Sequence, residues 1–225
     1  MRYQGKKQRS RLPLIIAAVI LLTAAGAAAL VLYRLNVIPH RMYDNSHFGI
    51  ETYVSQADAD GDGINDQADI LQSVRAYLAT EPKYKSAYYG TGYPDDGYGV
   101  CTDVVAFGLL GAGYDLRELL TQDIVARRED YDIEAIDKNI DFRRVNNLRV
   151  YFEHTAIPLT TDLTQIDQWQ GGDIVVFEKH IGVVSDMRNA HGVPFVLHHG
   201  SPNQRGYEQD ILESRDDIVA HFRIS

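Results

Sequence analysis

Gly99-Val100-Cys101-Thr102-Asp103-Val104-Val105 joins a glycine-rich turn to an apolar run that ends at Gly111-Ala112-Gly113. The apolar run and its glycine stop predict a central, buried helix that begins at Cys101. Cys101 is the only cysteine, so the chain forms no internal disulfide. At a helix N-terminus, free backbone N–H groups and the helix dipole stabilise a thiolate. Cys101 is therefore a candidate nucleophile, and inert packing of a buried thiol is the alternative.

Two histidine positions follow Cys101 in strand-like sequence. His180 lies in Lys179-His180-Ile181-Gly182-Val183-Val184, and His198 and His199 end the run Val196-Leu197-His198-His199. A histidine in an apolar strand costs desolvation free energy unless its ring nitrogens find partners. Cysteine first and histidine later, on separate elements, is typical of a cysteine hydrolase. Adjacent strand residues face opposite sides, so only one of His198 and His199 can face His180.

The wider pattern predicts helices first and strands later, which indicates the α+β class. Helical spacing predicts a helix from Asp69, a second that starts at Asp115 and a third that carries residues 145–152. Strands are expected at residues 172–177, 180–185, 194–199 and 221–224, because these runs are short, β-branched or aromatic, and separated by turn residues.

The N-terminus predicts a single-pass membrane protein. A basic tail, residues 1–11, precedes an uncharged apolar run, residues 12–33, that is long enough to span a bilayer. Basic flanks stay in the cytoplasm, so the rest of the chain is expected outside. A cleaved signal peptide is the alternative, because residues 24–29 are small. Residues 34–57 show little periodicity and are expected to form a stalk.

The charge balance excludes one class of partner. Without the five basic residues of the tail, 17 Lys and Arg remain against 31 Asp and Glu, a net charge of −14. Nucleic-acid binding requires clustered basic side chains, and no such stripe is visible. We therefore expect no nucleic-acid partner.

Residues 58–69 predict a calcium loop between stalk and domain. Carboxylates stand at positions 1, 3, 5, 9 and 12 of a twelve-residue loop, with Gly63 at position 6 for the sharp turn. A single loop with Asp at position 12 is similar to the thrombospondin type 3 kind, which implies a structural site; a solvated acidic turn is the alternative. The expected ligands are Asp58, Asp60, Asp62, the Ile64 carbonyl, Asp66 and Asp69.

Two further segments could contact a substrate. A tyrosine- and glycine-rich loop that includes Tyr93 lies just before Cys101 and is suited either to wall a cleft or to make plain turns. A polar cluster of Asn139, Asp141, Arg143 and Arg144 offers an arginine fork for a carboxylate, or forms a surface salt-bridge network. Asp173 and Asp186 flank the His180 strand and are read mainly as turn residues.

Several motifs in combination closely resemble the bacterial DUF1287 family, from about residue 69 to the C-terminus. They are the Cys101 stretch, Asp115-Leu116, residues 139–145, Trp169 with Gly172-Asp173-Ile174-Val175, residues 180–186 and His221-Phe222-Arg223. That family looks like a branch of the NlpC-type, papain-like cell-wall cysteine peptidases. The resemblance implies a nucleophile helix packed on an antiparallel sheet, with Cys101 as nucleophile, His180 as general base and His198 as the orienting third residue.

The chain departs from the broader group at the nucleophile. Those peptidases usually have Asp-Cys-Ser, whereas this chain has Val100-Cys101-Thr102, so Thr102 joins Tyr93 and Arg143 as a candidate substrate contact. The expected function is a membrane-anchored extracytoplasmic cysteine hydrolase, residues 70–225, that cleaves amide bonds of peptidoglycan peptides and needs no catalytic cofactor. A cysteine acyltransferase and an inactive, calcium-stabilised binding module are the alternatives.

Overall fold

The computed structural model describes residues 11–224, so most of the predicted basic tail lies outside the described residues. The chain divides after His40 into two units, an N-terminal one that contains α1 (Leu12–Arg34) and a C-terminal one from Arg41 onward. α1 is uncharged up to Arg34, 23 residues long, and has a mean hydropathy of 2.7 over its most apolar window. This length and composition are sufficient to cross a membrane and compatible with a single-pass membrane protein.

The C-terminal unit contains a six-stranded sheet in which all neighbouring strands are antiparallel. The strand order is β3-β8-β4-β5-β6-β7, so the last long strand, β8, lies between β3 and β4. A separate pair of short parallel strands, β1 and β2, precedes the nucleophile helix. The bounds are β1 Lys83–Tyr84, β2 Tyr98–Gly99, β3 Ile157–Pro158, β4 Ile174–Phe177, β5 His180–Arg188, β6 Pro194–Leu197, β7 Glu208–Gln209 and β8 Ile218–Arg223.

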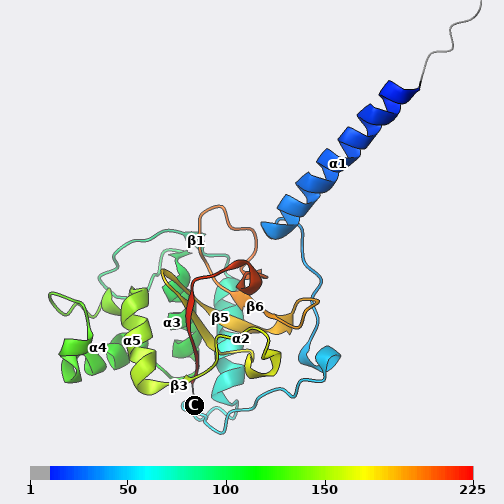
Figure 1. The fold of residues 1–225 in the computed structure, drawn as a ribbon. Coiled ribbons are helices and arrows are strands. Elements are labelled where there is room, and N and C mark those ends of the chain that lie inside the picture. Colours follow the sequence, from blue (N-terminus) through cyan, green and yellow to red (C-terminus); the bar gives the residue numbers. More distant parts are fainter. Residues whose placement is uncertain (1–10, 225) are drawn as a thin grey trace, which may run out of the picture. The chain divides into compact units, whose positions relative to one another are not determined.

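Four α-helices of this unit precede the strands of the large sheet, as the α+β prediction requires. α3 packs against both α2 and β5, and Figure 1 shows α3 beside β5. The α-helices are α2 Asp66–Leu78, α3 Cys101–Gly111, α4 Leu116–Ala126 and α5 Val145–Thr155. Short 3-10 turns are η1 Asn45–Phe48, η2 Arg128–Asp130, η3 Asp141–Arg143, η4 Ile166–Gln168 and η5 Leu212–Ser214.

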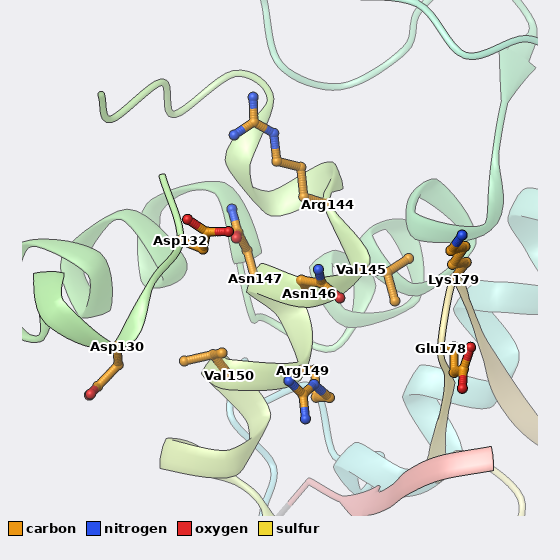
Figure 2. A pocket seen from close by; sticks show the side chains of 10 residues that line it. All are labelled: Asp130, Asp132, Arg144, Val145, Asn146, Asn147, Arg149, Val150, Glu178 and Lys179. Atoms are coloured by element: carbon orange, nitrogen blue, oxygen red, sulfur yellow. The ribbon is translucent and has the colours of Figure 1, made fainter. Parts of the chain in front are cut away.

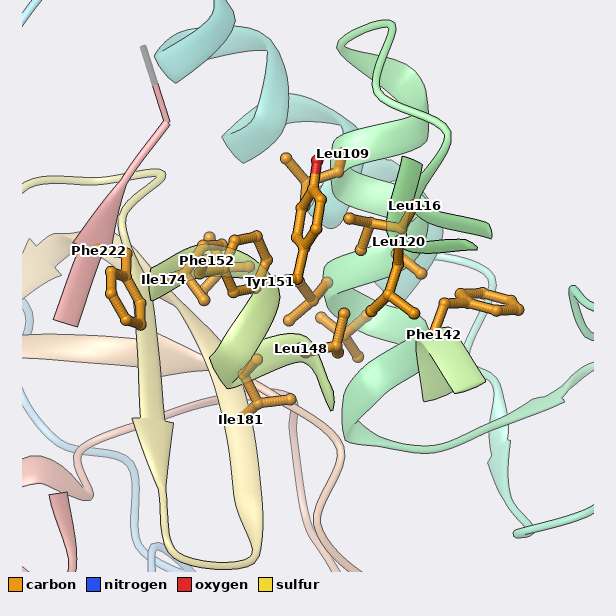
Figure 3. Packing of buried hydrophobic residues seen from close by; sticks show 14 of the residues in the cluster. Leu109, Leu116, Leu120, Phe142, Leu148, Tyr151, Phe152, Ile174, Ile181 and Phe222 are labelled. Carbon is orange, nitrogen blue, oxygen red and sulfur yellow. The ribbon is translucent and has the colours of Figure 1, made fainter. Parts of the chain in front are cut away.

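Strand alternation gives the sheet two buried faces. Ile174 and Ile181 belong to the main core beneath the helices, which Figure 3 shows meeting side chains of α3, α4 and α5. Their neighbours Val175 and Phe177 belong to a second cluster on the other face, around Trp169. The central strands are therefore covered on both sides, which explains why β4 reads as the continuous apolar run Ile-Val-Val-Phe.

Helix α2 begins three residues earlier than the sequence pattern suggested. Its N-cap is Asn65, whose side chain accepts a hydrogen bond from the Ala68 N–H, and its first residue is Asp66. The acidic segment therefore contains the first helical turn, because Asn65 caps the helix three residues before Asp69, where the helix was predicted to begin.

The predicted stalk, residues 34–57, is wrong for most of its length, because residues from Arg41 onward pack against the domain. Tyr43 forms a β-bridge with Arg188, and the buried Asn45 side chain accepts from Arg188 Nε at 2.6 Å. Asn45 also donates to Gln170 at 3.1 Å. Burial lowers the pKa of Arg188 to about 10, and the acceptors around it, Asn45 included, offset the desolvation of its charge. The connection between α1 and the part of the chain that packs on the domain is therefore residues 35–40.

Candidate active site

Cys101 is the first residue of α3, at the point where the helix N-terminus meets strand β5. The extended N-cap residue Val100 has no polar side chain, and Asp103 replaces that function by accepting the Val100 N–H at 2.8 Å. The backbone N–H groups of Ile181, Thr102 and Cys101 itself lie near the sulfur and lower its pKa, although none of the described groups forms a hydrogen bond to it. The nucleophile is therefore surrounded by backbone donors.

The electrostatics of the thiol differ from the sequence-based expectation. Burial raises the pKa of Cys101 to about 11, and the surrounding N–H groups offset this only in part. The nearby Asp103 carboxylate raises the pKa further. The helix N-terminus thus does not maintain a thiolate in the free protein, because desolvation outweighs the dipole here. Cys101 is therefore a neutral thiol at pH 7 in the free protein.

A neutral base stands at the first residue of β5. His180 Nε2 lies 3.0 Å from His198 Nδ1, and His198 Nε2 lies 3.1 Å from Gln209 Oε1. Burial lowers the pKa of His180 to about 4 and that of His198 to about 3. Both rings are therefore neutral at pH 7 and can accept a proton. The chain of contacts fixes the orientation of His180 through His198 and Gln209.

The two candidates for the third residue separate onto opposite sides. His198 pairs with His180, whereas His199 packs edge-on against Tyr84 and Tyr207, with ring centroids 5.2 Å apart in each case. The Asp103 carboxylate acts on His199, which places His199 toward α3. His199 Nδ1 is buried without a hydrogen-bond partner among the described residues. The alternation expected of adjacent strand residues accounts for this separation.

The backbone that follows His180 lies close to the Cys101 sulfur. The N–H beside the sulfur belongs to Ile181, the residue after His180. In the described residues no hydrogen bond links the sulfur directly to the ring, and His180 Nδ1 accepts none from any other described group. The Arg215 and Asp217 charges act on His180 in opposite directions. The His180 ring lies on the sheet face of Phe177, its cross-strand partner, whereas Ile181 and Cys101 belong to the core on the other face, so the described structure does not place Nδ1 beside the sulfur.

Two of the three candidate substrate contacts have structural partners instead. Arg143 was expected to bind a substrate carboxylate, but its side chain is buried and forks onto Asp103, with Nε 2.6 Å from Oδ1 and Nη2 2.9 Å from Oδ2. Tyr93 donates to Asp115 at 2.8 Å and packs between Phe107 and Phe142. Both polar groups are therefore engaged by neighbouring side chains, and their role toward a substrate stays a prediction. Thr102 Oγ1 is buried and has no partner among the described residues.

The other polar candidates also have structural roles. The buried Asp173 carboxylate accepts from Gln67, His221 and Arg223, and Asp186 pairs with Arg75 at 2.5 Å. Asn139 accepts from Arg117, and Arg144 pairs with Asp141 at 3.3 Å. These contacts favour the structural alternative that the sequence left open for each group.

In the acidic loop the structure brings together three of the expected calcium ligands. Carboxylate oxygens of Asp58, Asp60 and Asp62 lie within 4.8 Å of one another, and all three side chains are exposed. The side chain of Asp66 instead accepts from Ala59 N–H and Tyr114, and that of Asp69 from Ser73. Nearby carboxylates and burial raise the pKa of Asp69, so its charge still interacts with the loop. Hard oxygen ligands at this spacing fit a calcium ion chemically.

Sequence reasoning missed two residues that support the site. Gln209 lies in the two-residue strand β7, which has no periodicity to reveal it. Asp103 was quoted only as part of the nucleophile motif, although its position three residues after Val100 is that of a capping carboxylate. Both act on the catalytic candidates through hydrogen bonds rather than through direct contact with a substrate.

Comparison with known proteins gives a family. The family model described as a domain of unknown function, DUF1287, matches residues 71–224. The uncharacterized protein YijF of Escherichia coli K12 is 32% identical over 161 residues, which cover 68% of this chain and 77% of that protein. No solved structure matches. The matched region contains α3, the whole sheet and the residues Cys101, His180 and His198, and on this basis the chain belongs to the DUF1287 family.

Proposed function

We propose that the domain is a cysteine hydrolase of papain-like, NlpC-type architecture that cleaves amide bonds of cell-wall peptides. One arrangement carries this proposal. His180 is hydrogen-bonded to His198, which is hydrogen-bonded to Gln209, and the backbone N–H of Ile181, the residue after His180, lies near the Cys101 sulfur. A nucleophile on a helix N-terminus, a neutral base and a residue that orients the base are the three parts of a cysteine hydrolase site.

The mechanism follows from the two neutral groups. In this proposal the His180 ring turns toward the sulfur, and Nδ1 takes the Cys101 proton as the sulfur attacks the amide carbonyl to form a tetrahedral adduct that still carries the amine nitrogen. The Cys101 N–H at the free helix terminus donates to the developing oxyanion. His180 then protonates the departing amine, and the C–N bond breaks to leave a thioester. Water, deprotonated by His180, hydrolyses the thioester and restores the thiol.

Because the pKa of Cys101 is raised, proton transfer from the thiol and attack on the carbonyl would occur together. No thiolate–imidazolium ion pair would then form before the substrate binds. A thiol with a pKa of about 11 beside an imidazole with a pKa of about 4 stays un-ionised until substrate binds. The substrate excludes water and supplies the carbonyl that accepts the new bond. His198 and Gln209 hold His180 in the tautomer that leaves Nδ1 unprotonated.

The location and the acidic loop complete the proposal. The helix α1 would anchor the protein in the membrane with its N-terminus in the cytoplasm, so that the domain faces the cell wall. The Asp58, Asp60 and Asp62 cluster would bind a calcium ion that stabilises the entrance to α2. Calcium would act structurally, because the cluster precedes α2 whereas the nucleophile opens α3.

A second candidate function is a calcium-stabilised binding module with an inactive site. Two observations favour it. The pKa of Cys101 is raised, and no hydrogen bond joins the sulfur to the His180 ring among the described residues. Binding of cell-wall peptides without cleavage would then be the activity.

The deciding experiment compares the wild type with Cys101→Ala on purified peptidoglycan. We expect the wild type to release peptides, detected by mass spectrometry, and the variant to release none. His199→Gln is the matched control, since it changes the neighbouring histidine that faces away from His180, and it is expected to keep activity within a few-fold. Identical product spectra from wild type and Cys101→Ala would remove the hydrolase proposal, and retained binding without products would establish the binding module.

A further inference from the structure

A cavity lies at the beginning of α5, beside the β4–β5 turn that leads into His180. Its volume is about 480 Å³, and Figure 2 shows Asp130 and Asp132 on one side of the first turns of α5 and the Glu178–Lys179 turn on the other. Lys179 is the residue immediately before His180, so the cavity edge is one peptide unit from the proposed base. The lining residues are Asp130, Asp132, Arg144, Val145, Asn146, Asn147, Arg149, Val150, Glu178 and Lys179.

The lining carries both signs of charge in equal number. Arg144, Arg149 and Lys179 are cationic, and three carboxylates stand among the same ten residues. A site for a simple anion would carry a cationic excess, and a site for a metal ion would carry clustered carboxylates. Interspersed opposite charges instead complement a ligand that itself has both an anionic and a cationic group.

These charged groups are available to a ligand. Arg144 pairs with Asp141 and Arg149 with Glu153, in each case at 3.3 Å with about half of the arginine side chain exposed. The Arg149–Glu153 pair is exposed on both sides and therefore contributes little to stability and exchanges readily, whereas the Asp141 carboxylate that Arg144 faces is buried. Lys179 forms no ion pair among the described residues.

The helix terminus adds directional donors inside the cavity. The N-cap of α5 is Arg144, whose side chain makes no capping hydrogen bond, so the N–H groups of Val145 and Asn146 have no side-chain acceptor among the described residues. Asn147 is buried in the wall and fixed by donation to the Asp141 carbonyl at 3.1 Å. A carboxylate placed here would receive backbone N–H donors and the Arg144 and Lys179 charges together.

We propose that this cavity binds the zwitterionic end of a peptide substrate, a segment that carries a free carboxylate and a free amine a few bonds apart. The carboxylate binds at the α5 N-terminus beside Arg144, Arg149 and Lys179, and the ammonium binds Asp130, Asp132 or Glu178. The proposal rests on the proposed function, because it assigns a substrate end to a cavity that adjoins His180. It predicts selectivity for peptides with an unmodified terminus.

The test measures binding and cleavage separately. Binding of a synthetic tetrapeptide with a free C-terminal carboxylate and a free side-chain amine is measured by calorimetry on full-length Cys101→Ala in detergent micelles. The same peptide with a C-terminal amide, and the same peptide with an acetylated amine, are the ligand controls. We expect each modification to weaken binding about tenfold, as for the loss of one charge-assisted contact.

Substitutions of residues that line the cavity test whether the peptide binds there. Lys179→Met and Arg149→Gln are expected to weaken binding of the free-carboxylate peptide about tenfold and to leave binding of the amidated peptide unchanged. Asp132→Asn should act in the same way on the free amine and lose its effect with the acetylated peptide. Lys138→Met is the matched control, because Lys138 is also an exposed lysine, lies outside the cavity and pairs with Glu118 alone among the described residues.

The outcomes distinguish this proposal from the proposed function. Equal binding of free and amidated peptides, equal binding by Lys179→Met and Lys138→Met, or no binding of any peptide would overturn the cavity proposal, even if the wild type cleaves peptidoglycan. Variant-sensitive binding with no cleavage by the wild type would support the cavity and overturn the hydrolase. Lower KM for the free-terminus peptide, lost in Lys179→Met at unchanged kcat, would support both.

Discussion

The guanidinium of Arg143 forms an ion pair with the carboxylate of Asp103, with Nε 2.6 Å from Oδ1, and both side chains are buried. Asp103 stands two residues after the nucleophile and also accepts the Val100 N–H. Arg143 in turn donates to the Ala87 carbonyl at 2.5 Å. One ion pair therefore links the start of α3 to the loop before it and to η3, and fixes the position from which Cys101 projects.

Removal of Arg143 should be strongly destabilising. Arg143→Met leaves the Asp103 carboxylate buried and unpaired, which costs about 3–5 kcal/mol of unfolding free energy. Arg149→Met, which removes an ion pair with Glu153 that is exposed on both sides, should cost at most about 1 kcal/mol. Urea denaturation of both variants tests the difference. If the two variants unfold at the same urea concentration, the buried pair does not have the structural role assigned to it.

The reactivity of Cys101 should require high pH in the free protein. With a pKa of about 11, the thiol should be alkylated by iodoacetamide slowly at pH 7, with a midpoint well above the free-thiol value of about 8.5. Rates measured from pH 6 to pH 11 on full-length protein give this midpoint. A midpoint below about 8.5 would mean a thiolate stabilised at rest, and would replace the concerted activation proposed above with a resting ion pair.

His198 should matter for catalysis and His199 should not. His198→Ala removes the group that orients His180 and is expected to lower kcat on a cell-wall peptide about 100-fold with little change in KM. His198→Gln keeps a hydrogen-bonding side chain and should recover part of the loss. His199→Gln should stay within a few-fold of wild type. Comparable losses at both positions would indicate damage to the strand end rather than loss of an orienting residue.

The histidine pair should make the fold sensitive to acid. Burial lowers the folded-state pKa of His180 from 6.5 to about 4, so between these values the unfolded chain binds more protons and stability falls as pH falls. The His180 contribution is fully present above pH 6.5, and its loss by pH 4 amounts to about 3 kcal/mol. Thermal melts from pH 7 to pH 4 of wild type and His180→Phe measure it. Parallel curves for the two proteins would assign the acid sensitivity elsewhere.

The acidic loop should respond to calcium. Chelation is expected to lower Tm by about 3–5 °C, because an ion bound to the folded state alone stabilises it by mass action. Asp60→Asn should abolish the calcium-dependent shift, whereas Asp95→Asn, an exposed aspartate outside the loop, should preserve it. Unchanged melting of wild type in chelator and in calcium would leave these residues as acidic surface.

The sequence predicted those parts of the fold that depend on local patterns. The glycine stop after Leu110 and the apolar run after Cys101 were sufficient for α3, and Asp115 marked the N-cap of α4 correctly. The strands around His180 followed from their β-branched runs. The start of α2 was missed because Asn65, an N-cap residue, was read as part of a cation loop.

The parts that could not be predicted depend on pairing between distant segments. Whether Arg143 faces a substrate or a buried carboxylate depends on η3 packing against α3, and no local pattern records that packing. The choice between His198 and His199 required the register of β6 on β5, which the sequence leaves open until Val184 is known to pair with Val196. The pKa of Cys101 likewise depends on burial beneath β5, which outweighs the helix-end effect visible in the sequence.

The attachment of Tyr43 and Asn45 to Arg188 has a consequence for where the domain could act. Because the chain is tied to the domain from Arg41 onward, six residues, 35–40, connect it to the end of α1. Fully extended, they reach about 20 Å. If α1 holds the protein in a bilayer, this short connection would confine the domain to the layer nearest the membrane. It would then not reach more distant cell-wall material.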